Sequence, residues 1–392
     1  MNREVLGAII VALMAAAAGV GFLAGGGATP GGTIASTTLS TRVTTATSTV
    51  TLWQTTTVTT TVESTVTLGN QSSPYPYSSV KIAGVPLGGD TVLADPGAAE
   101  VYVAADGSPT IDVVDSSTNT LAAAIHLPEN STGSIAAGDG MVFAPMYGPF
   151  YYIFTFNDTT NSGGHLIPAH VQYVAFDSVT GVLYGSYNDS IVGINPETNA
   201  ILWNSSVGYS ISDLAVSSAK GMVYALGCRN FFVCGAEISF VNATSGSVIS
   251  QEETGSAYYP TMTVDPKTGI VYVSGEAEVI SYGPYGYLIY KSNPLTCGPF
   301  IAMTYNTASH QLVMAPQNYD YLLFYDGTSL ALVNMYFLPA PQSAPHAMAY
   351  DSANGEIYVL LPGQGLVALQ GNEPNGRINS TLIAPAYNCL PV

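Results

Sequence analysis

Beyond about Val80, the chain consists of short segments in which apolar and polar residues alternate, separated by polar turns. Alternation with a period of two is typical of a β-strand with one buried face. Six phrases share one arrangement: an alternating segment, a turn of four or five residues and a second alternating segment. These phrases begin at Val92, Val174, Leu214, Met262, Met303 and Met348, and a shorter copy begins at Ile135. The pattern therefore predicts seven β-hairpins.

The turns of these hairpins give the length of the repeat. Asp and Asn favour such turns because their side chains accept hydrogen bonds from backbone N–H groups further along the chain. The turns open at Asp95, Gly138, Asp177, Ser217, Asp265, Asn306 and Asp351. Their spacing averages about 43 residues, the length of a four-stranded propeller blade. The predicted fold class is therefore all-β, with a seven-bladed β-propeller of four-stranded blades over residues 79–392.

Two phrases of the repeat carry a family resemblance. AEVYVAADGSPTIDVVDSSTNTLAAAI, from Ala99, and TVDPKTGIVYVS, from Thr263, resemble the YVTN-type repeats of archaeal and bacterial surface-protein propellers. Because such propellers serve as scaffolds, binding modules and occasionally enzymes, the resemblance implies the architecture and a surface location rather than one activity.

The first 32 residues predict a membrane anchor or a signal. Val5 to Ala24 is uncharged, and about 20 helical residues span the ~30 Å of a bilayer core. This run is longer than the apolar core of a secretory signal, which favours an uncleaved transmembrane helix over a cleaved signal. The positive charge of Arg3 favours a location of the N-terminus inside the cell, so the remaining chain is expected outside it. It would be membrane-anchored if the segment is retained and secreted if the segment is cleaved.

Residues 33–78 predict a stalk. Between Thr33 and Thr67, 21 of 35 residues are Ser or Thr. Alternation of Thr with Val would permit strands, but both faces would carry mostly hydroxyl groups and bury little apolar area to offset the chain entropy. We therefore expect a solvated Thr/Ser-rich stalk, open to O-glycosylation, that lifts the propeller above a surface.

Composition and charge exclude several classes of protein. The 392 residues include 8 Lys and Arg against 26 Asp and Glu, a net charge of −18. Without basic residues to neutralise phosphates, the protein is not expected to bind nucleic acid. A hydrophobic content of 47% excludes a largely disordered chain, and the single long apolar run excludes a polytopic membrane protein. A charged fraction of only 9% favours either an acidic environment or a glycan-covered surface.

Cysteines and glycosylation sequons agree with export. The four cysteines, Cys228, Cys234, Cys297 and Cys389, fit two disulfides, with buried free thiols as the alternative. Cys228 with Cys234 would close a short hairpin, and Cys297 with Cys389 would fasten the C-terminus to the ring. Seven Asn-X-Ser/Thr sequons predict N-glycosylation at Asn70, Asn130, Asn157, Asn188, Asn204, Asn242 and Asn379.

The mouth of the central channel is the candidate ligand-binding site. The residues that precede each innermost strand are, in register, Asp90 or Thr91, Gln172, Asp213, Pro260 or Thr261, Ile301 and His346, and His170 lies two residues before Gln172. His346 with Asp90 and Asp213 could bind a cation or act as acid and base. The alternative is that these side chains only satisfy strand ends and line a hydrated channel.

No catalytic motif accompanies this site. The sequence contains no Gly-X-Ser-X-Gly elbow, phosphate loop, His-Glu-X-X-His or EF-hand loop, and no cofactor or metal site is expected. The leading hypothesis is a non-catalytic, membrane-tethered surface propeller that binds surface proteins or glycans in adhesion or in surface-layer or filament assembly. The alternatives are a lactonase-like or metal-dependent hydrolase that uses the channel mouth, and a tethered solute-binding component of a transporter. Tyrosine-rich segments near residues 148–156 and 281–290 could stack on sugars or contact proteins.

Overall fold

The structure is a computed structural model. It describes residues 39–42, 46–48, 58–60, 63–66 and 77–371, apart from 86–88, 149–150, 230–234, 257–259, 276–277, 293–298, 318 and 339–343. The chain divides into two compact units, Met1–Pro74 and Tyr75–Val392, and each is described by itself.

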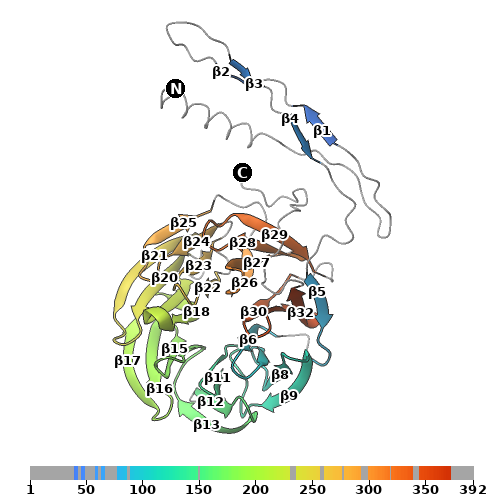
Figure 1. Cartoon of the computed structure of the whole chain (residues 1–392). Helices are drawn as coiled ribbons and strands as arrows, with labels where there is room; N and C mark the ends of the chain where they lie inside the picture. Colours follow the sequence, from blue (N-terminus) through green and yellow to red (C-terminus); the bar gives the residue numbers. More distant parts are fainter. Residues whose placement is uncertain are drawn as a thin grey trace. The chain divides into compact units, whose positions relative to one another are not determined.

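The second unit is a ring of seven four-stranded antiparallel sheets (Figure 1), which confirms the predicted all-β, seven-bladed propeller. Each sheet is one blade, and within a blade each successive strand lies farther from the centre of the ring. The first four blades are β6–β9 (Thr91–Asp95, Glu100–Ala104, Thr110–Asp115, Thr120–His126), β10–β13 (Ala136–Gly138, Met141–Met146, Tyr152–Asn157, Ser162–Pro168), β14–β17 (Tyr173–Asp177, Val182–Tyr187, Ser190–Asn195, Ala200–Ser206) and β18–β21 (Ser210–Ser217, Met222–Cys228, Gly235–Asn242, Val248–Ser256). The last three are β22–β25 (Met262–Val264, Val271–Ser274, Val279–Tyr282, Leu288–Lys291), β26–β29 (Phe300–Asn306, Gln311–Pro316, Tyr321–Asp326, Leu332–Phe337) and β30–β32 (Ala347–Asp351, Glu356–Leu361, Gly365–Gly371) with β5 (Tyr77–Lys81).

The predicted turns join the two innermost strands of every blade. In six blades the turn opens with an Asp, Asn or Ser, and the short blade β10–β13 has Gly138 instead. The carboxylate of Asp177 accepts a hydrogen bond from Val179 N at 2.9 Å, and that of Asp351 accepts one from Ala353 N at 2.8 Å. Local turn chemistry therefore fixes where each hairpin begins.

The ring is closed by a strand from the beginning of the propeller. β5 pairs with β32, with Val80 opposite Ala368, so that the first strand of the unit completes the last blade. The repeat did not predict this closure, because β5 has no hairpin partner near it in sequence. β5 begins at Tyr77, so the predicted boundary between residues 78 and 79 falls inside the strand.

Neighbouring blades are held together by apolar clusters and by tyrosine hydroxyls. One buried apolar cluster lies at each of the seven junctions between blades. The second strand of several blades carries a buried tyrosine whose hydroxyl donates to a turn of the next blade. The bonds run from Tyr184 to Ala243 O at 3.4 Å, from Tyr224 to Gly269 O at 3.1 Å and from Tyr272 to Gly327 O at 2.7 Å. Part of the high tyrosine content therefore serves packing between blades.

The N-terminal unit contains two short strand pairs within the segment predicted as a stalk. β1 (Leu39–Arg42) pairs with β4 (Glu63–Val66), and β2 (Ala46–Ser48) pairs with β3 (Val58–Thr60). Thr and Val are β-branched and favour extended backbone, so the alternation of Thr with Val forms strands there, while the stalk itself stays a prediction. The predicted anchor at residues 1–32 lies outside the described residues, and in the described part of the chain no helix is long and apolar enough to cross a membrane.

Candidate functional site

A cavity of about 510 Å³ at the centre of the ring is lined by residues from all seven blades. Most lining residues lie at the start of an innermost strand, because these strands run side by side around the channel. The polar side chains of the lining are Asp90, Thr91, Asp106, Thr132, Ser134, Tyr173, Ser212, Asp213, Thr261 and His346.

The structure brings most of the predicted site residues together. Asp90, Asp213 and His346 all line the cavity, as do Thr91, Pro260, Thr261 and Ile301. Two predicted residues lie outside the lining. Gln172 uses its backbone carbonyl to accept a hydrogen bond from Thr132 Oγ1 at 2.7 Å, and its neighbour Tyr173 lines the cavity instead. His170 lies in an aromatic cluster.

Asp213 is positioned by a β-bulge in β18. The pairing of β18 with β19 shifts between Ile211 and Asp213, so that Ser212 is the extra residue. A bulge of this kind redirects the side chains next to it. One carboxylate oxygen of Asp213 accepts a hydrogen bond from Met262 N of the next blade at 3.2 Å. Burial at the channel mouth raises the pKa of Asp213 to about 6, although backbone hydrogen bonds from Met262 and Leu214 lower it.

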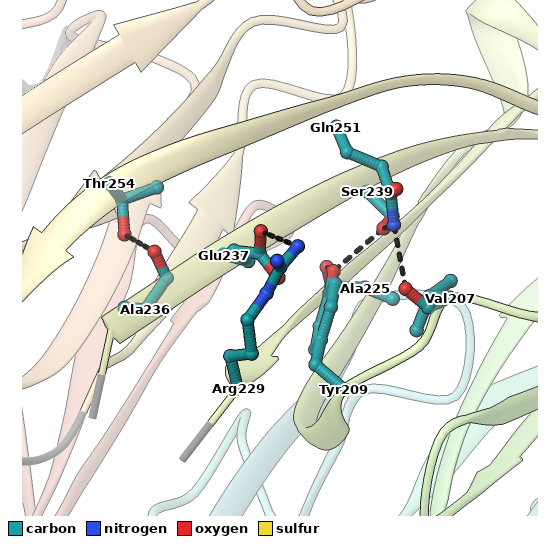
Figure 2. A network of polar contacts seen from close by, with 9 residues as sticks. All are labelled: Val207, Tyr209, Ala225, Arg229, Ala236, Glu237, Ser239, Gln251 and Thr254. Carbon is teal, nitrogen blue, oxygen red and sulfur yellow. Dashed lines mark hydrogen bonds and ion pairs between the residues drawn. The ribbon is translucent and has the colours of Figure 1, made fainter. Parts of the chain in front are cut away.

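A polar network joins the outer strands of the fourth blade to the segment that leads into β18 (Figure 2). Tyr209 comes directly before β18, and its hydroxyl lies 2.7 Å from Ala225 O and 2.8 Å from Ser239 Oγ. The Gln251 amide donates to the same Ser239 hydroxyl at 2.9 Å and to Val207 O at 2.7 Å. Because these bonds join the segment before β18 to β19, β20 and β21, they fix where β18 enters the channel.

The same network region contains a charged pair. Arg229 donates to both carboxylate oxygens of Glu237, at 3.0 and 2.6 Å (Figure 2). Such a two-bond fork is the strongest geometry for an Arg–carboxylate pair. Arg229 is therefore already neutralised by Glu237.

The first blade contributes a pair of acidic residues, Asp90 and Asp106, to the cavity lining. Asp90 accepts a hydrogen bond from Asp106 N at 2.7 Å, which holds the two residues side by side. The hydroxyl of Tyr147 lies next to the Asp106 carboxylate. Burial, together with this hydrogen bond to Asp106, raises the pKa of Tyr147 to about 12. Tyr147 therefore stays protonated at neutral pH, next to the lining residue Asp106.

An aromatic cluster continues outward from Tyr147. The ring of His170 packs against those of Tyr151 and Tyr187, with centroids 3.8 and 3.7 Å away, and the two tyrosine rings meet each other edge-on at 5.7 Å. Tyr147 meets Tyr151 edge-on at 6.4 Å. Tyr151 has a φ of 47°, a left-handed conformation that is rare for a bulky side chain. Strained backbone of this kind is concentrated at functional sites.

The sequence pattern predicted His170 and the tyrosines of residues 148–156 as candidates, but it did not predict Asp106 or the contact between His170 and Tyr151. The predicted site residues precede innermost strands, yet the loops between second and third strands lie on the same face, because strand direction alternates. Asp106 lies in such a loop, between β7 and β8, and the Asp-Gly pair there is a turn signal that could have drawn attention to it. Tyr151 directly precedes β12, whereas His170 lies in the connection from β13 to β14, so no local pattern brings them together.

The titration of Asp213 gives a testable pH dependence. Its folded pKa of about 6 lies above the ordinary value of 3.8, so the folded state binds this proton more tightly than the unfolded state. The free energy of unfolding should therefore rise as the pH falls from 7 to 4, by up to about 3 kcal/mol from this group. Asp213→Asn should remove this rise in urea unfolding across that range. A contrasting variant is Asp115→Asn: turn hydrogen bonds, with Ser117 foremost, lower the pKa of Asp115, so its contribution to stability is lost rather than gained on acidification.

The structure describes part of the predicted covalent modifications. Cys228 is disulfide-bonded, while Cys234, Cys297 and Cys389 lie outside the described residues, so the pairings stay predictions. Among the sequons, Asn130, Asn188 and Asn204 are exposed. The Asn157 amide donates to Gly140 O at 3.1 Å and the Asn242 side chain accepts turn hydrogen bonds, so these two are less suited to carry a glycan. Asn70 and Asn379 lie outside the described part.

Comparisons with known proteins bear on the fold. No protein-family model and no curated protein sequence matches the chain. Solved structures match with a TM-score of 0.61: Kuenenia stuttgartiensis hydrazine synthase at 9% identity over 74% of this chain and 97% of that chain, and the WD40 repeats of RRP9 at 10% identity over 74% and 97%. U3-55K matches with the same TM-score at 10% identity over 74% and 98%. Identities this low show the propeller fold alone, and the YVTN resemblance stays a prediction.

Proposed function

We propose that the protein is a non-catalytic binding module that takes a positively charged group into the cavity at the centre of its propeller. The observation that carries this proposal is the charge of the cavity. Asp90, Asp106 and Asp213 line it, and the described lining residues include no Lys or Arg. A concave site with one sign of charge concentrates field lines and attracts the opposite charge.

The surroundings of the cavity strengthen the preference for a cation. The whole chain carries a net charge of −18, so no long-range positive field opposes the approach of a cation. The Tyr147 hydroxyl contacts Asp106, and Tyr151 packs edge-on against Tyr147, so electron-rich aromatic rings, which attract cations, lie close to this acidic residue. An ammonium or guanidinium group on a small molecule or on a surface protein fits both features.

The hydrolase alternative gains no such support. Acid–base catalysis needs a base within hydrogen-bond reach of the group that it activates. The hydrogen bonds of Asp90 and Asp213 in the cavity come from the backbone N–H groups of Asp106 and Met262. Among the residues that the structure describes, no group of three or more His, Cys, Asp or Glu side chains is arranged to hold a metal ion. A tethered solute-binding component, in contrast, would use the same acidic cavity.

Calorimetric titration with arginine amide tests the proposal, with citrulline amide as the uncharged analogue of the same shape. We expect the protein to bind arginine amide at least about tenfold more tightly than citrulline amide at pH 7.5 and low salt. Binding should tighten between pH 5 and 7.5, because Asp213 loses its proton over that range and becomes charged.

Variants locate the binding site. Asp106→Asn should weaken arginine amide binding about tenfold, whereas Glu197→Gln, which removes an exposed carboxylate in the turn between β16 and β17, should not. Equal binding of the two amides, or binding of neutral sugars alone, would contradict cation recognition and favour a glycan ligand.

We also propose that the N-terminal residues tether this module at the cell surface. The support comes from the sequence, in which an apolar run of about 20 residues precedes a Ser/Thr-rich segment and seven sequons. Intact-mass measurement of the native protein tests this, because it reports whether residues 1–32 are retained and whether glycans are attached. A native chain without glycans that is recovered from the cytosol would contradict it.

A further inference from the structure

The outer edge of the fifth blade exposes an apolar surface that the cavity does not explain. We define the β25 patch as Val248, Ile249, Tyr285, Tyr287, Leu288, Ile289 and Tyr290. Tyr287 and Leu288 are 59% and 58% exposed, and every residue of β25 is exposed. Apolar residues scattered singly over a surface are ordinary, but a run of this kind marks an interaction site.

The β25 patch is continuous across two neighbouring blades. β21 and β25 lie next to each other on the outer rim of the ring (Figure 1). The hydroxyl of Ser250 in β21 donates to Tyr285 O at 3.1 Å, which fixes the β24–β25 turn against β21. A side chain at Gly286 would collide with Ser250 and Phe240, so this turn approaches β21 closely. The patch is therefore one surface rather than two.

We propose that the β25 patch is the contact surface between two copies of this chain. Its three half-exposed tyrosines and four aliphatic residues expose on the order of 700 Å², close to the ~800 Å² per partner of a standard protein–protein interface. Two acidic chains repel each other wherever carboxylates face one another, and residues 285–290 contain no charged residue. The patch therefore offers two copies a place to meet without repulsion.

The sheet geometry provides a symmetric way to make this contact. β25 is the last strand of its sheet and pairs with β24 on one side only. An exposed strand edge is a template for pairing with another chain. Antiparallel pairing of β25 with the same strand of a second copy around a two-fold axis would join two blades into one sheet. In the outer strand β17, which also exposes Ile201 and Leu202, the exposed sequon Asn204 makes the same contact less suitable.

Sedimentation of the full chain over a series of concentrations tests this inference. We expect a monomer–dimer equilibrium for the native sequence. Leu288→Glu combined with Tyr290→Glu should raise the dissociation constant of the dimer at least tenfold, because it places charge within the contact.

The control is the double variant Ser178→Glu and Val179→Glu, which changes two exposed positions. Val179 is 75% exposed and lies in the turn between β14 and β15, outside the β25 patch. This control adds the same charge and should leave dimerisation unchanged, and unaltered near-UV circular dichroism should show that both variants fold. A native chain that stays monomeric at every concentration would overturn the inference, as would a β25 variant that dimerises like the native chain, since association would then come from another part of the chain.

Discussion

A chain that begins at Ala83 is expected to lose the closed ring, whereas a chain that begins at Tyr75 should fold as a complete propeller. The shorter chain lacks β5, and with it the five register pairs between β5 and β32. It also lacks Ile82, which is buried in the cluster that joins the last blade to the first and whose N–H donates to Leu366 O at 2.9 Å.

The expected loss is large, because burial of one Ile side chain contributes about 2–3 kcal/mol and the strand pairing adds to it. We expect the free energy of unfolding to fall by on the order of 5 kcal/mol. The shorter chain should also aggregate, because β32 would become an open edge lined by apolar residues. Urea unfolding and sedimentation of the two chains measure both effects.

Two proline substitutions in the full chain separate strand pairing from the loss of residues. Because bonded and non-bonded pairs alternate and Ile82 N bonds to Leu366 O, the N–H of Val80 points toward β32 and that of Ser79 points away from it. Val80→Pro should therefore destabilise the ring much more than Ser79→Pro. Equal stability of the two variants would show that pairing with β32 does not close the propeller.

Gly227→Ala is expected to destabilise the fourth blade and to displace Asp213. Gly227 lies in β19 opposite Ile211, next to the bulge that positions Asp213. A Cβ atom at Gly227 would collide with the carbonyl oxygen of Ser210, which belongs to the backbone and cannot rotate away. We therefore expect a loss of about 3 kcal/mol in the free energy of unfolding.

The matched control lies in the same blade. A Cβ atom at Gly235 would meet nothing within 4 Å, so Gly235→Ala should leave stability unchanged or slightly higher. Gly227→Ala should also weaken arginine amide binding, because β18 carries Asp213 into the cavity. If Gly227→Ala had the same free energy of unfolding as the native chain, β18 would be able to move away from the new Cβ atom without destabilising the blade. The bulge would then not fix the position of Asp213.

Much of the fold could be predicted because the repeat depends on residues that are close together in the sequence. Alternating residues encode strands, and an Asp or Asn such as Asp177 or Asn306 encodes the turn wherever it occurs. The location of Asp90, Asp213 and His346 in one cavity could also be predicted, because the innermost strands of a ring begin around one channel. Asp106 was not predicted because it follows the second strand of its blade. It reaches the cavity because β7 runs antiparallel to β6 and so ends on the face where β6 begins.

Patterns of period two and turn residues act over a few neighbouring positions, so the amino-acid order alone determined the strands, the hairpins and the number of blades. Contacts between distant residues decided the rest. β5 joins β32 from the opposite end of the propeller, and the carboxylate of Asp213 reaches its pKa of about 6 only where the closed ring removes it from bulk water. Burial and strand pairing across the ring exist only in the folded chain, so they could not be predicted from any short segment of the sequence.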